Sequence, residues 1–198
     1  MLVNGIKSRP VYGKITLEAT ARRHIVALEG EGALALTEQT GSPELAKAEV
    51  LYVTMGSAPH GHDKALAALQ ALDFWMAPTI PVLVSRLKTM LVTAKMGTRL
   101  YLSGTEGFIG QTMQVALNAG MDFNSIRTEH RGSEARRVQC VHCKGITDNV
   151  KTSPYKCTHC GLNLLVRDHY SRRLAAFQGV CIEAEEPGTA PPPEELFS

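Results

Sequence analysis

The sequence predicts an α/β fold, a small doubly wound and mostly parallel sheet, followed by a C-terminal zinc ribbon. Strand-like apolar runs alternate with helical patterns through the first 130 residues, which favours parallel strands joined by right-handed crossovers. Two Cys-x-x-Cys pairs then follow, with thirteen residues between them. Four thiolates arranged as two close pairs suit one tetrahedral metal ion, most often Zn²⁺.

The order of the elements follows from hydrophobic spacing. Short apolar runs predict strands at residues 11–17 (at a sheet edge), 22–28, 50–55, 80–84, 98–102 and 123–129. Apolar residues three and four apart predict helices over residues 64–75, 85–96 and 108–119. We expect Asp63 to cap the first of these helices, Pro78 and Pro81 to end it, and Gly120 to cap the last.

Three turns follow predicted strands, and in open α/β sheets ligands bind at the carboxyl ends of the strands. The turn after residue 28 has a Gly-x-Gly pattern, which occurs in phosphate-binding turns, but two neighbouring glutamates would repel a pyrophosphate. The preferred interpretation is that this turn only connects a strand to a helix and binds no ligand. The candidate cofactor-binding residues in the three turns are Gly30, Gly32, Gly56, Ser103 and Gly104.

The predicted metal ligands are Cys140, Cys143, Cys157 and Cys160. A glycine follows each pair, at Gly145 and Gly161, so the backbone can curl back and bring amide N–H groups to the metal-bound sulfurs. The insert between the pairs is long enough for a β-hairpin arm, and residues 162–166 are expected to form the last strand. His142 and His159 lie between ligands, and we expect both side chains to point outward.

Composition and charge divide the chain into three parts. We expect an α/β Rossmann-like domain over residues 1–137, a zinc-ribbon domain over 138–182 and an acidic, Pro-rich tail over 183–198. Residues 131–181 carry nine Lys and Arg against three Asp and Glu, whereas the tail carries five acidic residues and no basic ones. This contrast suggests either an acidic partner surface or a tail that masks the basic module. The tail itself is expected to be disordered, or to become ordered on a partner.

The composition is that of an ordinary globular protein, with 198 residues, 44% of them hydrophobic and 20% charged. No apolar run approaches the ~20 residues of a membrane helix, and the first ten residues lack the apolar core of a signal peptide. Four of the five cysteines stand in metal-binding spacing, which indicates a reducing compartment, and Cys181 is expected to be an ordinary thiol. The expected location is therefore the cytoplasm, without membrane contact.

The stretch from Arg99 to Phe108, with the helix and strand behind it, resembles part of a known family. It is similar to the last strand–turn–helix–strand of the NAD(P)-binding half of ferredoxin-reductase-type flavoproteins. In that family the turn usually reads Cys-Gly-Pro-x-Gly-Phe, and its cysteine lies near the nicotinamide. Here Ser103 and Thr105 stand at the cysteine and proline positions. The resemblance therefore implies the fold of about residues 20–130, and it puts hydride transfer by this chain in doubt.

The two cysteine pairs and residues 162–180 after them resemble the C-terminal domain of the DmmA-like subunit of dimethylamine monooxygenase. The order of the domains is similar too, so this resemblance spans nearly the whole chain. It implies an accessory subunit, without catalytic residues, of a multi-subunit NADPH-dependent bacterial haem oxygenase that converts dimethylamine to methylamine and formaldehyde. It also implies Zn²⁺ in this chain, with haem, FMN and a 2Fe-2S centre mainly on partner subunits.

The stretch Arg167-Asp-His-Tyr-Ser-Arg-Arg173 is the candidate surface for docking on those partner subunits. Arg and aromatic residues are enriched at the centres of protein interfaces, and Arg pairs with carboxylates through two hydrogen bonds. The candidate docking residues are Arg167, Asp168, Tyr170, Arg172 and Arg173. The alternative, left open, is that Arg167 and Asp168 brace the ribbon against the α/β domain.

Two other functions stay open. The excess of six positive charges over residues 131–181 favours a nucleic-acid-binding zinc ribbon, although the module lacks an interleaved Arg and aromatic repeat for base stacking. Nucleic acid is therefore the disfavoured partner. Iron in the four-cysteine site would give a rubredoxin-like electron-transfer module, because Fe and Zn share this geometry. His24, His130 and His169 are expected to be satisfied or exposed side chains, not haem ligands.

Overall fold

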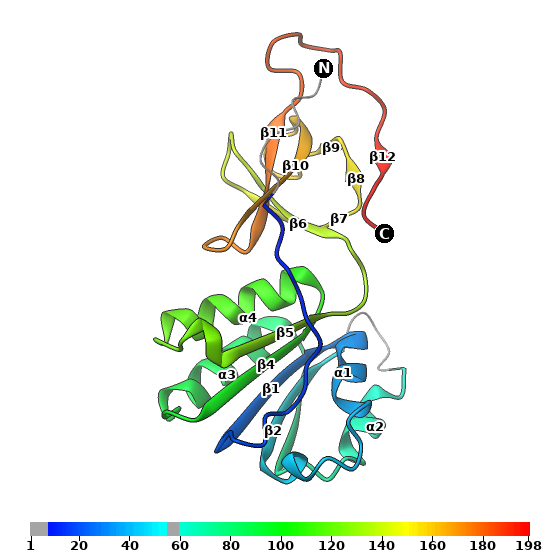
Figure 1. The fold of residues 1–198 in the computed structure, drawn as a ribbon. Helices are drawn as coiled ribbons and strands as arrows, with labels where there is room; N and C mark the ends of the chain where they lie inside the picture. Colours follow the sequence, from blue (N-terminus) through cyan, green and yellow to red (C-terminus); the bar gives the residue numbers. More distant parts are fainter. Residues whose placement is uncertain (1–7, 55–59) are drawn as a thin grey trace. The chain divides into compact units, whose positions relative to one another are not determined.

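The computed structural model describes residues 8–54 and 60–198, which form two compact units (Figure 1). The α/β unit comprises Tyr12–Gly132, and the ribbon unit comprises Ser133–Ser198 together with residues 8–11. Within the described ranges, no helix is both long enough and apolar enough to cross a membrane.

The sheet of the α/β unit contains five parallel strands in the order β3-β2-β1-β4-β5 (Figure 1). The strands are β1 (Arg23–Glu29), β2 (Ala48–Val53), β3 (Asp73–Ala77), β4 (Thr98–Gly104) and β5 (Ile126–His130). The strand order reverses between β1 and β4, as it does in doubly wound sheets. The predicted fold class of this part is confirmed.

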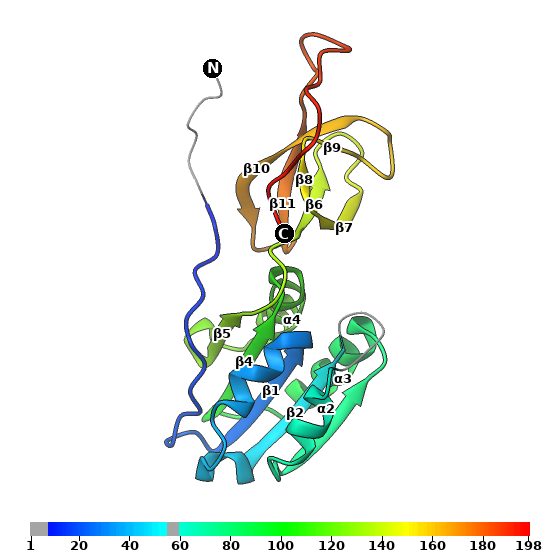
Figure 2. The ribbon, with the colours of Figure 1, turned by 90° about the vertical axis from the view of Figure 1, so that its right-hand side faces the viewer.

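Helical segments cover both faces of this sheet, as the two perpendicular views show (Figure 2). They are η1 (Gly30–Ala33), α1 (Leu34–Thr37), η2 (Pro43–Lys47), α2 (His62–Ala67), α3 (Ile80–Val92), α4 (Glu106–Asn118) and η3 (Phe123–Ser125). The long helices α3 and α4 pack on the face that carries Ile25 and Leu51. The short segments η1, α1, η2 and α2 pack on the face that carries Val26 and Val50. Both faces of β1 and β2 are buried, which explains their continuous apolar runs.

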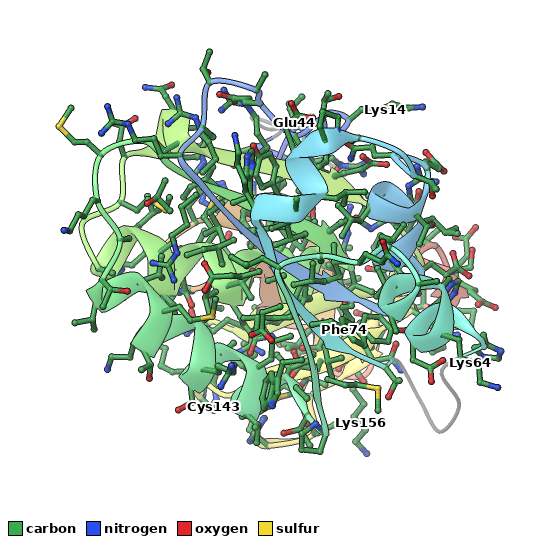
Figure 3. All side chains as sticks on the ribbon, turned by 90° about the horizontal axis from the view of Figure 1, so that it is seen from below. Lys14, Glu44, Lys64, Phe74, Cys143 and Lys156 are labelled. Atoms are coloured by element: carbon green, nitrogen blue, oxygen red, sulfur yellow. The ribbon has the colours of Figure 1, made fainter. Side chains whose placement is uncertain are left out.

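The predicted helix over residues 64–75 is wrong beyond its first turns. Helix α2 ends at Ala67, and Phe74 and Trp75 lie in the edge strand β3. Their side chains pack against opposite faces of the sheet, which is the two-residue period of a strand. In Figure 3, Phe74 lies among the packed side chains, whereas Lys64 of α2 extends outward. The residue before α2 is Gly61 in a left-handed conformation, so Asp63 is not its N-cap.

Two predicted strands are absent. Residues 80–84 form the start of helix α3, where Pro81 occupies the first turn and its missing N–H group leaves no hydrogen bond unmade. Residues 11–17 form no strand, although the Gly13 N–H group donates a 3.0 Å hydrogen bond to the Thr128 carbonyl group of β5. The Ile15 N–H group instead donates a 2.7 Å hydrogen bond to the buried Glu129 carboxylate. The Glu129 side chain therefore accepts the hydrogen bond from the Ile15 N–H group that a neighbouring strand was expected to accept.

The ribbon unit contains a five-stranded sheet in the order β7-β6-β11-β10-β9 and a separate two-stranded pair, β12-β8. The strands are β6 (Arg136–Cys140), β7 (Ile146–Val150), β8 (Thr152–Ser153), β9 (Tyr155–Lys156), β10 (Asn163–Ser171), β11 (Ala176–Cys181) and β12 (Glu194–Glu195). Residues 167–179 lie in the β10–β11 hairpin, whose strands pair in antiparallel register.

Both ends of the described chain pack on the ribbon, which differs from the predicted domain boundaries. The division falls after Gly132, and residues 8–11 join the ribbon unit because Ser8 bridges to the β10 backbone. The acidic tail is also ordered. Its residues Glu194–Glu195, strand β12, pair with β8 (Figure 1). Phe197 is buried in the ribbon core. The tail therefore completes the ribbon, and it was wrongly predicted to be disordered or to await a partner.

His24 offers a pH test of the α/β core. Its fully buried ring shares a 3.2 Å hydrogen bond with the Tyr101 hydroxyl, and burial lowers its pKa below the usual value. Below about pH 6.5 the unfolded chain binds a proton that the folded chain excludes, so stability falls with falling pH by up to about 1.4 kcal/mol per unit. We expect His24→Phe to lose this dependence in thermal melts between about pH 8 and pH 5. An unchanged wild-type profile in the variant would contradict this origin.

Candidate metal centre and docking surface

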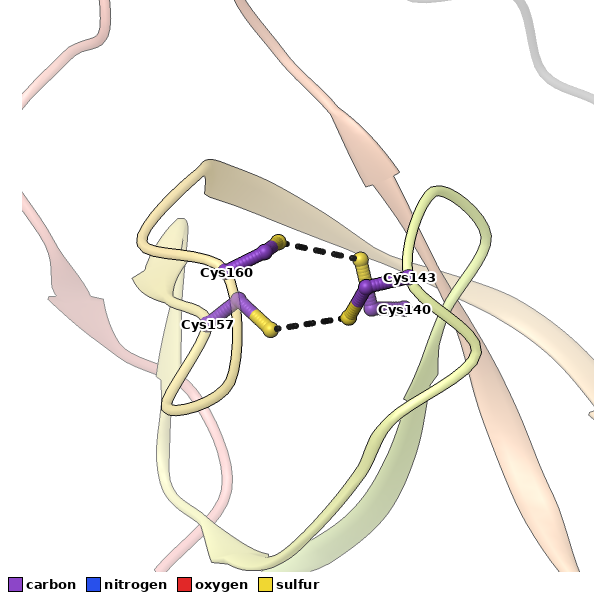
Figure 4. A group of neighbouring side chains, drawn as sticks. All are labelled: Cys140, Cys143, Cys157 and Cys160. Atoms are coloured by element: carbon purple, nitrogen blue, oxygen red, sulfur yellow. Dashed lines mark hydrogen bonds between the residues drawn. The ribbon is translucent and has the colours of Figure 1, made fainter.

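The four predicted metal ligands converge on one point of the ribbon unit (Figure 4). Their sulfur atoms lie within 4.8 Å of one another, and the Cys140–Cys160 and Cys143–Cys157 Sγ–Sγ distances are both 3.8 Å. A tetrahedron of sulfurs about 2.3 Å from a central ion has edges of about 3.8 Å. No disulfide joins these cysteines. The donor set therefore fits a single tetrahedral metal ion.

Each cysteine pair lies on a tight turn closed by backbone hydrogen bonds. The Lys144 N–H group donates to the Cys140 carbonyl at 3.0 Å, and the Gly161 N–H group donates to the Cys157 carbonyl at 3.0 Å. Lys144 and Gly161 both adopt positive φ, at 63° and 78°. The predicted backbone reversal is thus present after both pairs, although a lysine takes the left-handed position in the first turn.

Two backbone N–H groups favour the thiolate of the second turn. Burial alone would raise the pKa of Cys157, but hydrogen bonds from the Cys160 and His159 amides bring it down to about 7. A lowered thiol pKa favours metal binding, because the thiolate is the ligand.

His159 connects the two turns without contacting the metal position. Its Nε2 atom lies 2.9 Å from the Ile146 carbonyl oxygen, and its ring covers Gly145. A β-carbon at Gly145 would lie 2.5 Å from that ring, so only glycine allows this contact. His159 was predicted to point outward, and it is exposed, but its ring also fixes the turn that carries the first cysteine pair.

Asp168, a predicted docking residue, binds within its own unit. Its carboxylate accepts hydrogen bonds from Arg9 at 2.9 Å and from Arg136 at 2.8 Å. Burial raises its pKa, but these two guanidinium groups hold the pKa below the usual value. The Asp168 backbone carbonyl also accepts from the Ser8 N–H group. Asp168 therefore ties the N-terminal segment and β6 to β10.

Arg136 is the buried centre of this arrangement, and no pattern in the sequence marks it. Its guanidinium lies 4.0 Å from the ring centroids of both Phe177 and Phe197. Its side chain is 6% exposed and pairs with Asp168. An arginine in a polar segment looked like part of a linker, and Phe197 lay in an acidic tail. Only the tertiary structure brings these residues together.

The other predicted docking residues occupy different positions. Tyr170 packs edge-on against Phe177, with ring centroids 5.1 Å apart, so it belongs to the ribbon core. Arg167 is exposed on β10, and Arg172 and Arg173 are exposed in the turn of the β10–β11 hairpin. The predicted stretch therefore divides into a structural part and an exposed basic part.

The candidate cofactor-binding residues lie where β1 and β4 end, except Gly56, which falls outside the described residues. Gly30 and Gly32 are buried in η1, and Ser103 and Gly104 end β4. A β-carbon at Gly32 would collide with the Ser103 carbonyl group, so the two turns pack directly against each other.

Both parts of the chain match models of one family. Residues 4–126 match the N-terminal domain, and residues 137–180 the C-terminal domain, of the dimethylamine monooxygenase subunit DmmA-like models. The chain belongs to this DmmA-like family. It is also 34% identical, over 150 residues, to the heme-dependent oxidative N-demethylase delta subunit of Ectopseudomonas mendocina (strain ymp). That alignment covers 72% of this chain and 84% of the relative.

Solved structures resemble the fold more distantly. A ferredoxin reductase of carbazole 1,9a-dioxygenase is 15% identical with a TM-score of 0.41, covering 57% of this chain and 33% of that one. The flavohemoglobin of Malassezia yamatoensis is 16% identical with a TM-score of 0.43, covering 61% of this chain and 36% of its own. This DmmA-like chain thus spans about a third of each of those proteins.

Proposed function

We propose that this chain is an accessory subunit of an NADPH-dependent haem monooxygenase that demethylates dimethylamine to methylamine and formaldehyde. Catalysis takes place on partner subunits that hold haem, FMN and a 2Fe-2S centre, and the complex is cytoplasmic. The observation that carries the proposal is membership of the DmmA-like family over both parts of the chain. The relative named as a subunit of a heme-dependent N-demethylase supports it.

The metal in this proposal is Zn²⁺ in a structural role. Four thiolates complete the tetrahedron and leave no open position for water or substrate, which is typical of structural zinc sites. A 2Fe-2S cluster would spread four cysteines over two irons, whereas these sulfurs lie within 4.8 Å of one another. A single iron would fit equally well and would be coloured and redox-active. Metal analysis with a visible spectrum should find zinc and no visible band; an iron band would favour the rubredoxin-like alternative.

The exposed basic end of the β10–β11 hairpin is the proposed docking surface. Arg172 and Arg173 present two positive charges there, which suit a partner surface rich in carboxylates. We expect the double variant Arg172→Glu, Arg173→Glu to weaken binding to the partner subunits at least about tenfold at low salt. Surface plasmon resonance on the isolated partners measures this.

The matched control reverses two exposed lysines of the α/β unit, Lys88→Glu and Lys95→Glu, which change the net charge equally. An equal loss of affinity in both double variants would show a general charge effect and contradict docking through the hairpin. Melting curves of both variants confirm that the fold is kept.

Co-purification from the native host tests the subunit role itself. An affinity tag on this chain should recover haem-bearing and flavin-bearing chains in fixed proportion. The recovered complex should also consume NADPH when dimethylamine is added. Recovery of the chain alone, or with RNA, would overturn the proposal.

A further inference from the structure

We infer that Glu29 supplies a built-in carboxylate at the place where a dinucleotide would bind the α/β unit, and that this unit therefore binds no dinucleotide. The inference concerns residues of this chain alone. It adds to the proposed function that NADPH must be bound by another subunit.

The position of Glu29 follows from the topology. The strand order reverses between β1 and β4, and open α/β sheets bind nucleotides outside the carboxyl ends of the strands at this reversal. Glu29 is the last residue of β1, and its neighbour across the reversal is the end of β4. It is 4% exposed, so its side chain is packed inside the protein at this reversal of the strand order.

The Glu29 carboxylate takes the hydrogen bonds that an anionic ligand would use. Its Oε2 atom accepts from the Thr105 N–H group at 2.9 Å and from the Thr105 hydroxyl at 2.6 Å. Thr105 is the N-cap of the thirteen-residue helix α4, and such N-termini attract phosphate groups. Burial raises the pKa of Glu29, but the two Thr105 hydrogen bonds favour its charged form, and a pyrophosphate would meet repulsion from that charge.

The space beside this carboxylate is also filled. A β-carbon at Gly104 would lie 2.7 Å from the Glu29 Cβ atom, so the glutamate side chain packs directly on the β4 backbone. A β-carbon at Gly32 would lie even closer, 2.2 Å, to the Ser103 carbonyl oxygen. Because these two glycines lack a β-carbon, Glu29 and the Ser103 carbonyl group pack directly against them, and this packing leaves no space for a ligand.

The connection after β1 provides no alternative phosphate site. In dinucleotide-binding folds a full helix follows the first strand and directs its N-terminus at the pyrophosphate. Here the four-residue 3-10 helix η1 and the four-residue helix α1 take its place, and Glu31 adds a negative charge. Ser103 is fully buried, so its hydroxyl cannot reach a nicotinamide outside the sheet.

The first experiment titrates NADPH into the zinc-loaded full chain, labelled with nitrogen-15, up to about 1 mM, the upper end of usual KM values. We expect no saturable shift of the amide signals of residues 29–32 and 103–108. A saturable shift of these signals would overturn the inference. Failure of the chain to co-purify with partners would leave this result untouched, so the two proposals fail separately.

The second experiment tests Glu29 as the internal acceptor of the Thr105 hydrogen bonds. Glu29→Leu keeps roughly the size of the side chain but removes the oxygen that accepts both hydrogen bonds. We expect it to lower the melting temperature of the α/β unit by about 4–8 °C. The control, Glu31→Leu, makes the same substitution at an exposed position of the same turn and should shift the melt by no more than about 1 °C. Equal melts for the two variants would overturn the role given to Glu29.

Discussion

Cys140→Ser is expected to release the metal and to unfold the ribbon unit, while the α/β unit keeps its structure. Cys140 is fully buried, and its sulfur stands 3.8 Å from that of Cys160. The ribbon core is small, and two of its buried members, Cys140 and Cys157, are themselves predicted metal ligands. Structural zinc binding supplies about 10–16 kcal/mol in small modules, so its loss exceeds what such a core can replace.

Two measurements on the same sample separate these effects. Mass spectrometry under native conditions reports the metal content, and amide exchange reports local unfolding residue by residue. We expect protection to vanish in β6, β7, β10 and β11 and to persist in β1 and β4. Cys181→Ser is the matched control, because Cys181 lies in β11 outside the cluster and should keep both metal and protection. Full protection of the ribbon in Cys140→Ser would contradict the metal assignment.

The parts of the fold that the sequence predicted well are those where local pattern and tertiary structure agree. The cysteine spacing predicted the convergence of the four sulfur atoms directly, because two close pairs have few ways to surround one ion. The strands β1, β2 and β4 were found because their apolar runs are buried on both faces. Helix α4 was found because its spacing agrees with Gly120 after its end, at a φ of 83°.

The errors arose where a local pattern fits two structures. The apolar residues of 64–75 suit a helix as well as a helix followed by a strand, and pairing of β3 with β2 decides for the strand. Pro81 can end one helix or begin another, and burial of Leu83 and Leu87 decides for the second. The spacing of residues in the sequence does not show that β3 pairs with β2, nor which face of α3 is buried.

The contacts of the candidate site also depend on residues that are far apart in the sequence. Glu29 was recognised as a charge that would repel a pyrophosphate, but its bonds to Thr105 depend on β1 lying beside β4. Arg136 and Phe197 are 61 positions apart and meet only because the tail folds back along β8. Contacts of such separation leave no periodic signal in a single sequence.

The second largest loss of stability is expected for Asp168→Asn. This variant tests whether Asp168 stabilises the ribbon or contacts a partner subunit. The substitution leaves the Arg136 guanidinium, which is 6% exposed, without its carboxylate partner. Removing one partner of a buried ion pair is strongly destabilising, although the 25% exposure of Asp168 reduces the cost to about 2 kcal/mol. For a unit of this size that corresponds to a fall of about 8 °C or more in the melting temperature of the metal-loaded ribbon.

Arg167→Gln is the control for this variant, because Arg167 is the exposed neighbour on the same strand. If Asp168 is structural, its variant loses stability, and Arg167→Gln melts like the wild type. If Asp168 instead contacts a partner, both variants keep their melting temperature and Asp168→Asn alone loses affinity for the partner subunits. We expect the first result, because Arg9, Arg136 and the Ser8 backbone already use the hydrogen-bonding capacity of Asp168 within the ribbon. Docking would then depend on the hairpin arginines, and Asp168 would hold the sheet that presents them.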